Sequence, residues 1–374
     1  MNKTFCILPW THVCSTTEND IIPCCRFYTK DIPSKVELLN NIGIDALNTE
    51  RFKSIRRDML EGIRVPECKK CYNEEENNKI SYRQESNSLY LNSSVETFTE
   101  NFNETYSIEI SLDNICNLQC RMCSSQFSTK LILRDKLLNY KVYKKLESDY
   151  SFLEFLDISK LKKIKILGGE PVMSPNFEKF LDYIIDRSTP ENIIVHLVTN
   201  GTHEITPVLI KRLEKFKTVH LAVSLDAYDT ANDYQRHGSS YITIWNNANT
   251  YRKFLKNATV GFHTVISLYN ANVIYKTLSK FEENDFGYST DFVYNLEMSI
   301  EHAPDDYAEW LLEKNKSHNT AQQIIENMLR RRKYDKERWS EFLSNTKKLD
   351  NYYKISLNDY NVDLYNFLNK RYGY

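Results

Sequence analysis

The chain has 374 residues and a balanced charge, with 49 lysine and arginine residues against 50 aspartate and glutamate residues. This length predicts about two or three domains with ample core. The balanced charge gives no overall field that would favour nucleic acid or an anionic membrane. The first residues lack the apolar core of a signal peptide, and no apolar run approaches membrane-spanning length. We therefore expect a cytoplasmic protein whose nine cysteines are metal ligands rather than disulfides.

The N-terminal region contains cysteines at spacings that suit a metal site. The pair Cys68-Lys-Lys-Cys71 is joined by two distant thiols, Cys6 and Cys24 or its neighbour Cys25. Such a set of four can close around an iron–sulfur cluster or a zinc ion, and structural zinc stays open as the alternative. Cys14 and the second member of the Cys24-Cys25 pair would then be spare thiols.

From Ile108 onward, short apolar strands alternate with segments of helical period. Helical spacing occurs over 177–185, 244–255 and 274–281, and earlier over 44–59, where Gly62 ends it. Two helix starts have a hydroxyl N-cap before a proline at the first helical position, namely Ser174-Pro175 and Thr206-Pro207. The expected strands are Ile108–Asp113, Lys163–Leu167, Ile193–Thr199, Val219–Leu225, Val260–Ile266 and Asp291–Leu296.

The alternation of strand and helix predicts parallel βα units. Six such units indicate an α/β fold with an open or partial (β/α)6 barrel, in which ligand sites lie at the C-terminal ends of the strands. The tail from about Asp305 is charged and poor in strands, and it predicts a helical extension. Its basic run Arg330–Lys333 indicates a solvated helix face rather than a nucleic-acid site, because acidic residues surround it.

Three thiols follow the first expected strand in the loop Cys116-Asn-Leu-Gln-Cys120-Arg-Met-Cys123. They can hold three irons of a four-iron cluster and leave the fourth iron open for substrate or cofactor chemistry. Structural zinc and free thiols are the alternatives, but zinc usually takes two close pairs of ligands. The spacing resembles the signature loop of the radical S-adenosylmethionine (radical SAM) enzymes. Many members have an aromatic residue where this chain has Met122, which still provides an apolar cover.

Polar motifs follow several other expected strands. In Gly168-Gly169-Glu170-Pro171, the glycines let the backbone approach a ligand closely and the carboxylate can receive an ammonium group, with an ordinary turn as the alternative. This motif resembles the family's segment that receives the methionine amino group of SAM. Ser224 and Asp226 resemble the family's polar residues near the ribose hydroxyls. Arg236 resembles the arginine that pairs with the SAM carboxylate, a surface arginine being the alternative. Asn200 joins these cofactor-binding candidates, although turn chemistry alone explains its Asn-Gly pair.

The N-terminal cysteines resemble the auxiliary domains of radical SAM proteins that are called twitch or SPASM domains. The smaller twitch form holds one additional four-iron cluster. The usual glycine before the Pro23-Cys24 element is missing, and Asn19-Asp20 can make that turn instead. The resemblance implies an auxiliary domain over 1–103, a radical SAM partial barrel over 104–300 and a helical C-terminal extension over 301–374.

The resemblance implies a radical SAM enzyme that uses a [4Fe–4S] cluster on Cys116, Cys120 and Cys123, a second auxiliary [4Fe–4S] cluster, and SAM. Cleavage of SAM would give a 5′-deoxyadenosyl radical that removes a hydrogen atom from the substrate. A peptide or protein substrate is favoured over a small polar molecule such as a sugar or alcohol. Flavodoxin or ferredoxin would supply electrons. A non-enzymatic iron–sulfur electron carrier is the third class, and no catalytic acid or base can be named.

Overall fold

The computed structural model describes residues 3–17, 20–27, 47–91, 95–102, 104–146, 150–294 and 296–374. The chain divides into two compact units. The first unit contains Met1–Asn114, Lys145–Leu197 and Pro207–Val219, and the second contains Ile115–Lys144, Val198–Thr206 and His220–Tyr374. The units are therefore interleaved along the chain. The domain boundaries near residues 103 and 300 stay a prediction.

The first unit is built on a mostly parallel run of strands. Their order is β2-β1-β3-β4-β5, with β5 passing into the second unit at Val198. Strands β1, β3, β4 and β5 are parallel neighbours, and β2 is antiparallel to β1. The prediction of a mostly parallel α/β sheet is thus confirmed. The bounds are β1 His12–Ser15, β2 Ile21–Ile22, β3 Ser107–Ser111, β4 Lys163–Leu167 and β5 Ile194–Thr199.

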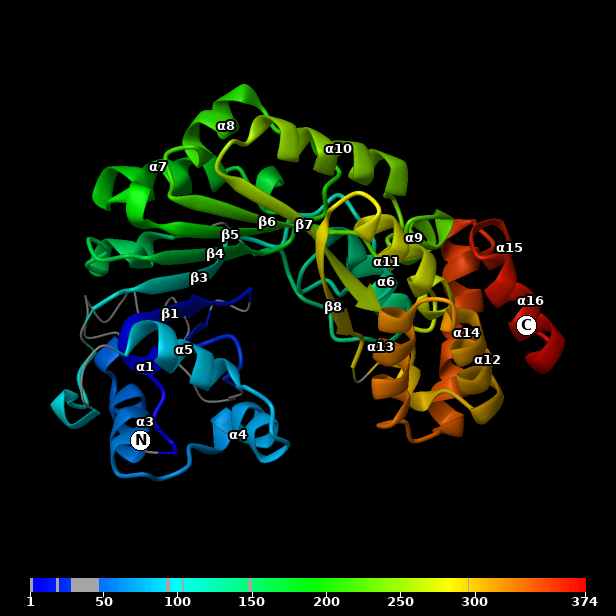
Figure 1. The fold of residues 1–374 in the computed structure, drawn as a ribbon, viewed down its shortest axis with the longest axis horizontal. Coiled ribbons are helices and arrows are strands. Elements are labelled where there is room, and N and C mark those ends of the chain that lie inside the picture. The colour runs from blue at the N-terminus through cyan, green and yellow to red at the C-terminus, as the bar shows by residue number, and fades with distance from the viewer. Residues whose placement is uncertain are drawn as a thin grey trace. The chain divides into compact units, whose positions relative to one another are not determined.

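Strands β3 to β5 have one apolar face and one polar face. The apolar face is formed by the buried side chains of Ile108, Ile110, Ile164, Ile166, Val195 and Leu197. Because side chains alternate along a strand, the residues between these point to the opposite face. That face includes Ser107 and Glu109 of β3, beside Lys163 and Lys165 of β4. Helices α7 and α8 lie above β4 and β5 in Figure 1, whereas α1 and α5 lie below β1.

The helices of the first unit follow from local signals. Helix α3 ends where Gly62 adopts a left-handed φ of 78°, as the sequence predicts for its C-terminus. Helix α8 begins at Pro207, also as predicted. The predicted start of α7 at Ser174-Pro175 is wrong, because Ser174 closes the preceding 3-10 turn and Asn176 is the N-cap. The helices are α1 Leu8–Thr11, α3 Glu50–Leu60, α4 Lys69–Glu76, α5 Tyr82–Tyr90, α7 Phe177–Arg187 and α8 Pro207–Leu213.

The second unit continues the pattern of alternating strands and helices. Strand β6 begins at the end of the first unit and is followed in the sheet order by β7 and β8, which are parallel. Strand β8 begins four residues before its predicted start at Asp291. The prediction missed this start because the side chains there are alternately exposed and form no apolar run. The elements are α6 Ile132–Leu137, β6 Thr218–Ser224, α9 Thr230–Gln235, α10 Tyr241–Phe254, β7 Ala258–Ile266, α11 Ile274–Glu282 and β8 Gly287–Phe292.

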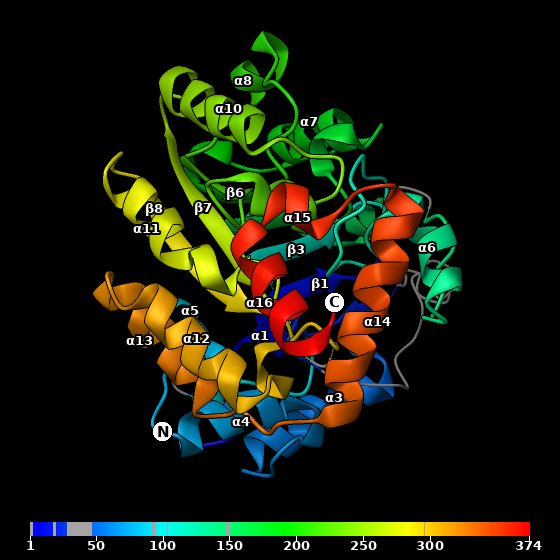
Figure 2. The same ribbon diagram turned by 90° about the vertical axis from the view of Figure 1, so that its right-hand side faces the viewer.

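The C-terminal part of the second unit is helical, as predicted. Figures 1 and 2 both show α12 and α13 lying side by side. Aromatic contacts join α12 to the last helix, α16 (Val362–Tyr372), where Trp310 stacks on Phe367 at 4.6 Å between ring centroids. No helix in the described part of the chain has the length and apolar character needed to cross a bilayer. The helices are α12 Asp305–Asn315, α13 Asn319–Leu329, α14 Lys336–Tyr353, α15 Leu357–Tyr360 and α16 Val362–Tyr372.

Candidate iron–sulfur and cofactor site

The three cysteines of the signature-like loop lie close together in the second unit. Cys120 is buried, and Cys116 and Cys123 are partly buried. The pKa of Cys123 is raised to about 11, first by burial and then by the charge of Cys116. Burial also raises the pKa of Cys120, with further contributions from Cys123 and Cys116 that Arg236 opposes. Three thiols that influence one another in this way form a donor set that fits three irons of a cluster.

An arginine that the sequence analysis did not single out holds the backbone of this loop. The Arg134 guanidinium is fully buried and donates to the carbonyl oxygens of Cys120 at 3.2 Å, Arg121 at 3.1 Å and Cys123 at 2.5 Å. It also forms an ion pair with the adjacent Asp135. Asp135 in turn accepts a hydrogen bond from the Ser125 backbone at 2.6 Å. The loop is therefore fixed by charge-assisted contacts to its carbonyl groups.

The segment containing Arg236 pairs with the same loop. The backbone amide of Gln119 donates to the His237 carbonyl at 2.9 Å, and that of Arg121 donates to the Gln235 carbonyl at 2.8 Å. Arg236 itself is 7% exposed. Burial opposes its charge, but the charges of Asp226 and Cys120 outweigh this and raise the Arg236 pKa. The structure thus brings Arg236 to the cysteine loop, as a cofactor contact requires.

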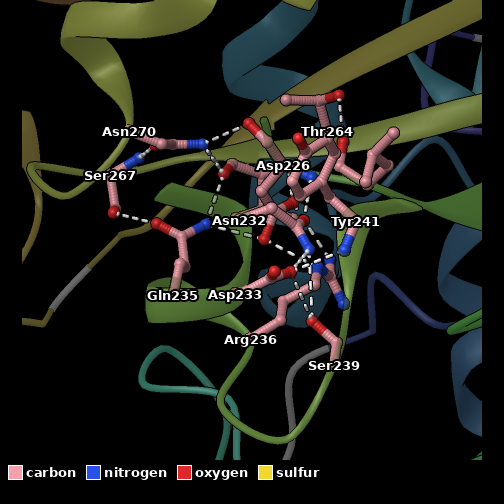
Figure 3. Close-up of polar contacts among 12 residues, drawn as sticks. Asp226, Asn232, Asp233, Gln235, Arg236, Ser239, Tyr241, Thr264, Ser267 and Asn270 are labelled. Atoms are coloured by element: carbon pink, nitrogen blue, oxygen red, sulfur yellow. Dashed lines mark hydrogen bonds and ion pairs between the residues drawn. The ribbon is translucent and has the colours of Figure 1, made fainter. Parts of the chain in front are cut away.

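Asp226 lies at the centre of a buried hydrogen-bond network (Figure 3). Its carboxylate accepts hydrogen bonds from Gln235 at 2.7 Å, Arg236 at 3.0 Å and the Val265 backbone at 2.8 Å. The Arg236 Nε lies 2.7 Å from the second carboxylate oxygen. Protein groups therefore occupy both oxygens of Asp226, and the carboxylate fixes the position of the Arg236 side chain. Its predicted contact with the ribose hydroxyls stays a prediction.

Two other candidates of the second unit lie at strand ends. Asn200 follows β5 and donates to Asn117 Oδ1 at 2.8 Å, and its amide nitrogen lies 3.7 Å from Cys116 Sγ. Asn117 donates in turn to Thr202 Oγ1 at 2.9 Å. The Asn-Gly turn is therefore tied to the cysteine loop, which turn chemistry alone does not require. Ser224 is the buried last residue of β6.

The C-terminal helices reach the cysteine loop through Arg121. Its guanidinium is buried, lies 3.7 Å from the ring centre of Tyr234, and forms an ion pair with Asp350 of α14 at 2.6 Å. Asp350 also accepts hydrogen bonds from Tyr234 at 2.7 Å and from the Leu357 backbone at 3.0 Å. No sequence pattern predicts this pairing, because no local spacing relates residues so far apart.

The glycine motif belongs to the first unit. Gly168 has a φ of 135°, and a Cβ there would lie 2.7 Å from the Asp113 carbonyl oxygen, so no other residue fits without strain. The amide of Gly169 donates to the same carbonyl at 2.9 Å. Glu170 is buried and accepts a hydrogen bond from the Val172 backbone at 3.3 Å. Gly168 is therefore needed for this close backbone approach, and the role of the motif toward a ligand stays a prediction.

The four N-terminal cysteines also influence one another within the first unit. The pKa of Cys68 is raised to about 12, first by burial and then by the charges of Cys24 and Cys71. Burial also raises the pKa of Cys6, and the charges of Cys68 and Cys71 raise it further. Cys24 and Cys68 pack against the buried cluster that contains Cys6, whereas Cys25 is exposed. These four thiols therefore lie near one another in the first unit, and a metal centre made of Cys6, Cys24, Cys68 and Cys71 stays a prediction.

Comparisons with known proteins agree with the cysteine loop. Residues 110–280 match the family described as the Radical SAM superfamily. The GTP 3′,8-cyclase of Aliarcobacter butzleri (strain RM4018) is 25% identical over 119 residues, which span 32% of this chain and 34% of that protein. The structure titled "Native anSMEcpe with bound AdoMet" aligns with a TM-score of 0.44 and 16% identity over 61% of this chain and 64% of that one. Streptococcus suis SuiB bound to precursor peptide SuiA aligns with a TM-score of 0.42 and 15% identity over 72% and 62%.

The matched range contains the cysteine loop, the glycine motif and the Arg236 segment, all of which the sequence analysis connected with one family. Residues 110–280 form a radical SAM domain, and such a domain supports an enzyme of the radical SAM family. This family implies a [4Fe–4S] cluster and SAM. The chain spans about a third of the curated relative that it matches, so the activity of the whole protein is a matter for proposal.

Proposed function

We propose that this enzyme modifies a peptide or protein by radical chemistry and uses an auxiliary metal cluster to do so. When bound, the SAM cluster supplies an electron that cleaves SAM to the 5′-deoxyadenosyl radical, which removes a hydrogen atom from the substrate. Cys116, Cys120 and Cys123 hold that cluster. The chain's own contribution is to position the cofactors and to exclude water from them.

Arg236 binds the SAM carboxylate in this proposal, and Asp226 acts as a positioning residue for it. The support is the buried pair of Arg236 with Asp226 beside the cysteine loop. A guanidinium fixed in this way offers its remaining N–H groups to a carboxylate in a shielded setting. Glu170 receives the SAM amino group, and Ser224 contacts the ribose hydroxyls, as the family resemblance implies.

Replacing Arg236 by alanine is expected to weaken SAM binding by roughly tenfold or more, because a charge-assisted contact of this kind contributes about 1.5–3 kcal/mol. Equilibrium binding of SAM to anaerobically reconstituted protein measures the effect. The exposed Arg64 provides the control, since Arg64→Ala should leave the dissociation constant unchanged. If the Arg236→Ala protein keeps its full iron content and its SAM affinity, a residue other than Arg236 binds the SAM carboxylate.

The N-terminal set Cys6, Cys24, Cys68 and Cys71 holds the auxiliary [4Fe–4S] cluster in this proposal. The packing of Cys24 with Cys6, and the exposure of Cys25, favour Cys24 as the fourth ligand. The ligands come from separated segments, so the bound cluster would fasten the N-terminal region together. Zinc in the same set is the alternative.

Iron counting separates these alternatives. If both sets bind four-iron clusters, anaerobic reconstitution should yield about eight irons per chain. Replacing Cys116, Cys120 and Cys123 by alanine should leave about four irons, held by the N-terminal set. Further loss of Cys68 and Cys71 should remove those irons and lower the stability of the first unit. If the triple variant instead retains one zinc and no iron, the N-terminal cysteines form a structural zinc site.

One observation supports the peptide substrate: a second cysteine set gathers in the first unit of a chain that also has a radical SAM domain. Auxiliary-cluster members of the family often act on peptides. The experiment offers the reduced enzyme short peptides encoded by neighbouring open reading frames. A modified peptide should appear by mass spectrometry together with 5′-deoxyadenosine, and deuterium from labelled peptide should enter the 5′-deoxyadenosine. Turnover of a sugar or alcohol, with every such peptide unchanged, would favour the small-molecule alternative.

A further inference from the structure

The two thiols that neither proposed cluster uses lie near a buried histidine and glutamate in the first unit. Strands β1 and β3 are parallel, and their register pairs His12 with Ser107 and Cys14 with Glu109. Because side chains alternate along each strand, His12 and Cys14 point to the same side of β1. A ring nitrogen of His12, the Cys14 sulfur and a Glu109 carboxylate oxygen lie within 4.8 Å of one another.

All three side chains are withdrawn from solvent. His12 and Glu109 are each 4% exposed, and Cys14 is 3% exposed. The Nδ1 of His12 bonds to Ser107 Oγ at 2.7 Å, which leaves Nε2 as the free ring nitrogen. His12 Nε2 has no hydrogen-bond partner among the described residues, and Glu109 Oε2 is paired with the Lys165 ammonium at 3.4 Å. Burying the His12 ring nitrogen without a partner costs free energy, so its placement indicates a missing ligand.

The donor types and their spacing suit zinc. Zinc takes imidazole nitrogen and carboxylate oxygen at about 2.0–2.2 Å and thiolate sulfur at about 2.3 Å in a tetrahedron. Tetrahedral donors at those lengths are roughly 3.3–3.8 Å apart, so small side-chain rotations bring the three atoms to the required separation. The contact between Nδ1 and Ser107 also orients the ring, as outer hydrogen bonds do for metal-bound histidines.

A fourth donor is available from Cys25. Burial and then the charge of Glu109 raise the pKa of the Cys25 thiol, and the charge of Cys25 acts on Cys14, so this thiol lies near both residues. The adjacent Cys24 instead packs against the cluster that contains Cys6. Cys24 and Cys25 therefore take part in different groups of side chains.

We propose that His12, Cys14, Cys25 and Glu109 bind one zinc ion, in a site separate from the Cys6, Cys24, Cys68 and Cys71 set. This ion links β1 to β3 on the polar face of the sheet and ties the Cys24-Cys25 turn to both strands. This zinc site does not depend on which substrate the enzyme modifies. A negative test of the zinc site and a negative test of the peptide substrate are therefore separate results.

The test uses full-length protein with its iron–sulfur clusters reconstituted, then supplied with Zn²⁺ and desalted. Elemental analysis should find about one zinc per chain in addition to the iron. Zinc K-edge X-ray absorption, which iron does not obscure, should show sulfur at about 2.3 Å together with nitrogen or oxygen at about 2.0–2.1 Å. A shell of four sulfurs would place the zinc in the Cys6 set and overturn the proposal, as would wild-type protein that retains no zinc.

Substitutions of the proposed zinc ligands provide a second test. Glu109→Gln should weaken zinc binding by at least tenfold with the iron content unchanged. Cys25→Ser changes an exposed residue, so it keeps the fold intact, and it should remove one sulfur from the zinc shell. His196→Gln is the matched control, because His196 pairs with Lys165 in the sheet register but lies outside the group of donors. Equal zinc affinity in wild type, Glu109→Gln and Cys25→Ser would show an adventitious ion only.

Discussion

Replacing Cys120 by alanine is expected to abolish the cleavage of SAM. Cys120 is the buried central member of the cysteine loop, and two thiols cannot supply the three ligands that the SAM-binding cluster needs. Anaerobically reconstituted, reduced wild-type protein should convert SAM to 5′-deoxyadenosine and methionine. The Cys120→Ala protein should form no 5′-deoxyadenosine above the level of an enzyme-free reaction. Liquid chromatography of both products measures the outcome.

A control from the same loop separates cluster ligation from general disturbance. Met122→Leu keeps the apolar volume between Cys120 and Cys123, so it should retain most of the cleavage activity. Loss of activity in Met122→Leu as well would mean that the loop, rather than the thiol, limits the reaction. Persistent cleavage in Cys120→Ala would contradict the cluster assignment itself.

Replacing Asp350 by alanine is expected to lower the free energy of unfolding by about 3–5 kcal/mol, because the substitution leaves the buried Arg121 guanidinium without its ion partner. The hydrogen bond from Tyr234 is lost as well. Since Arg121 lies between Cys120 and Met122, the iron bound at the loop should also fall. Chemical denaturation and iron analysis of the same preparation measure the two effects.

Asp359 on α15 provides the matched control for this substitution. It is an exposed aspartate in the same helical region, so Asp359→Ala should change stability by less than about 1 kcal/mol and leave the iron content unaltered. Equal stability of the Asp350→Ala protein and wild type would show that the ion pair contributes nothing to the loop.

Strands β3 to β7 could be predicted because each is a short run with apolar alternation, whereas β8 has no such run and overlaps its predicted range only at Asp291 and Phe292. The spacing of Cys116, Cys120 and Cys123 likewise identified the family, because that pattern is local. Strand β1 was missed, since His12–Ser15 is four residues long and its polar side chains give no alternation. It became part of the sheet only through its pairing with β3, which depends on residues about a hundred positions later.

The supports of the cysteine loop were also beyond the reach of sequence patterns. Arg134 and Asp135 are adjacent charged residues in a short helix, which ordinarily indicates an exposed turn, yet both are fully buried. Arg121 looks like a polar residue of the loop until its partner on α14 is known. Such contacts depend on the three-dimensional packing, because no period or spacing relates the residues involved.

The ion pair between Arg121 and Asp350 has a consequence for the order in which the enzyme matures. The two residues are 229 positions apart in the sequence, so the cysteine loop cannot reach its final packing until α14 has been synthesised. Contacts of such long range also slow folding, because the intervening chain must first be brought together. A cluster bound to this loop therefore reaches its final surroundings only after α14 has been synthesised.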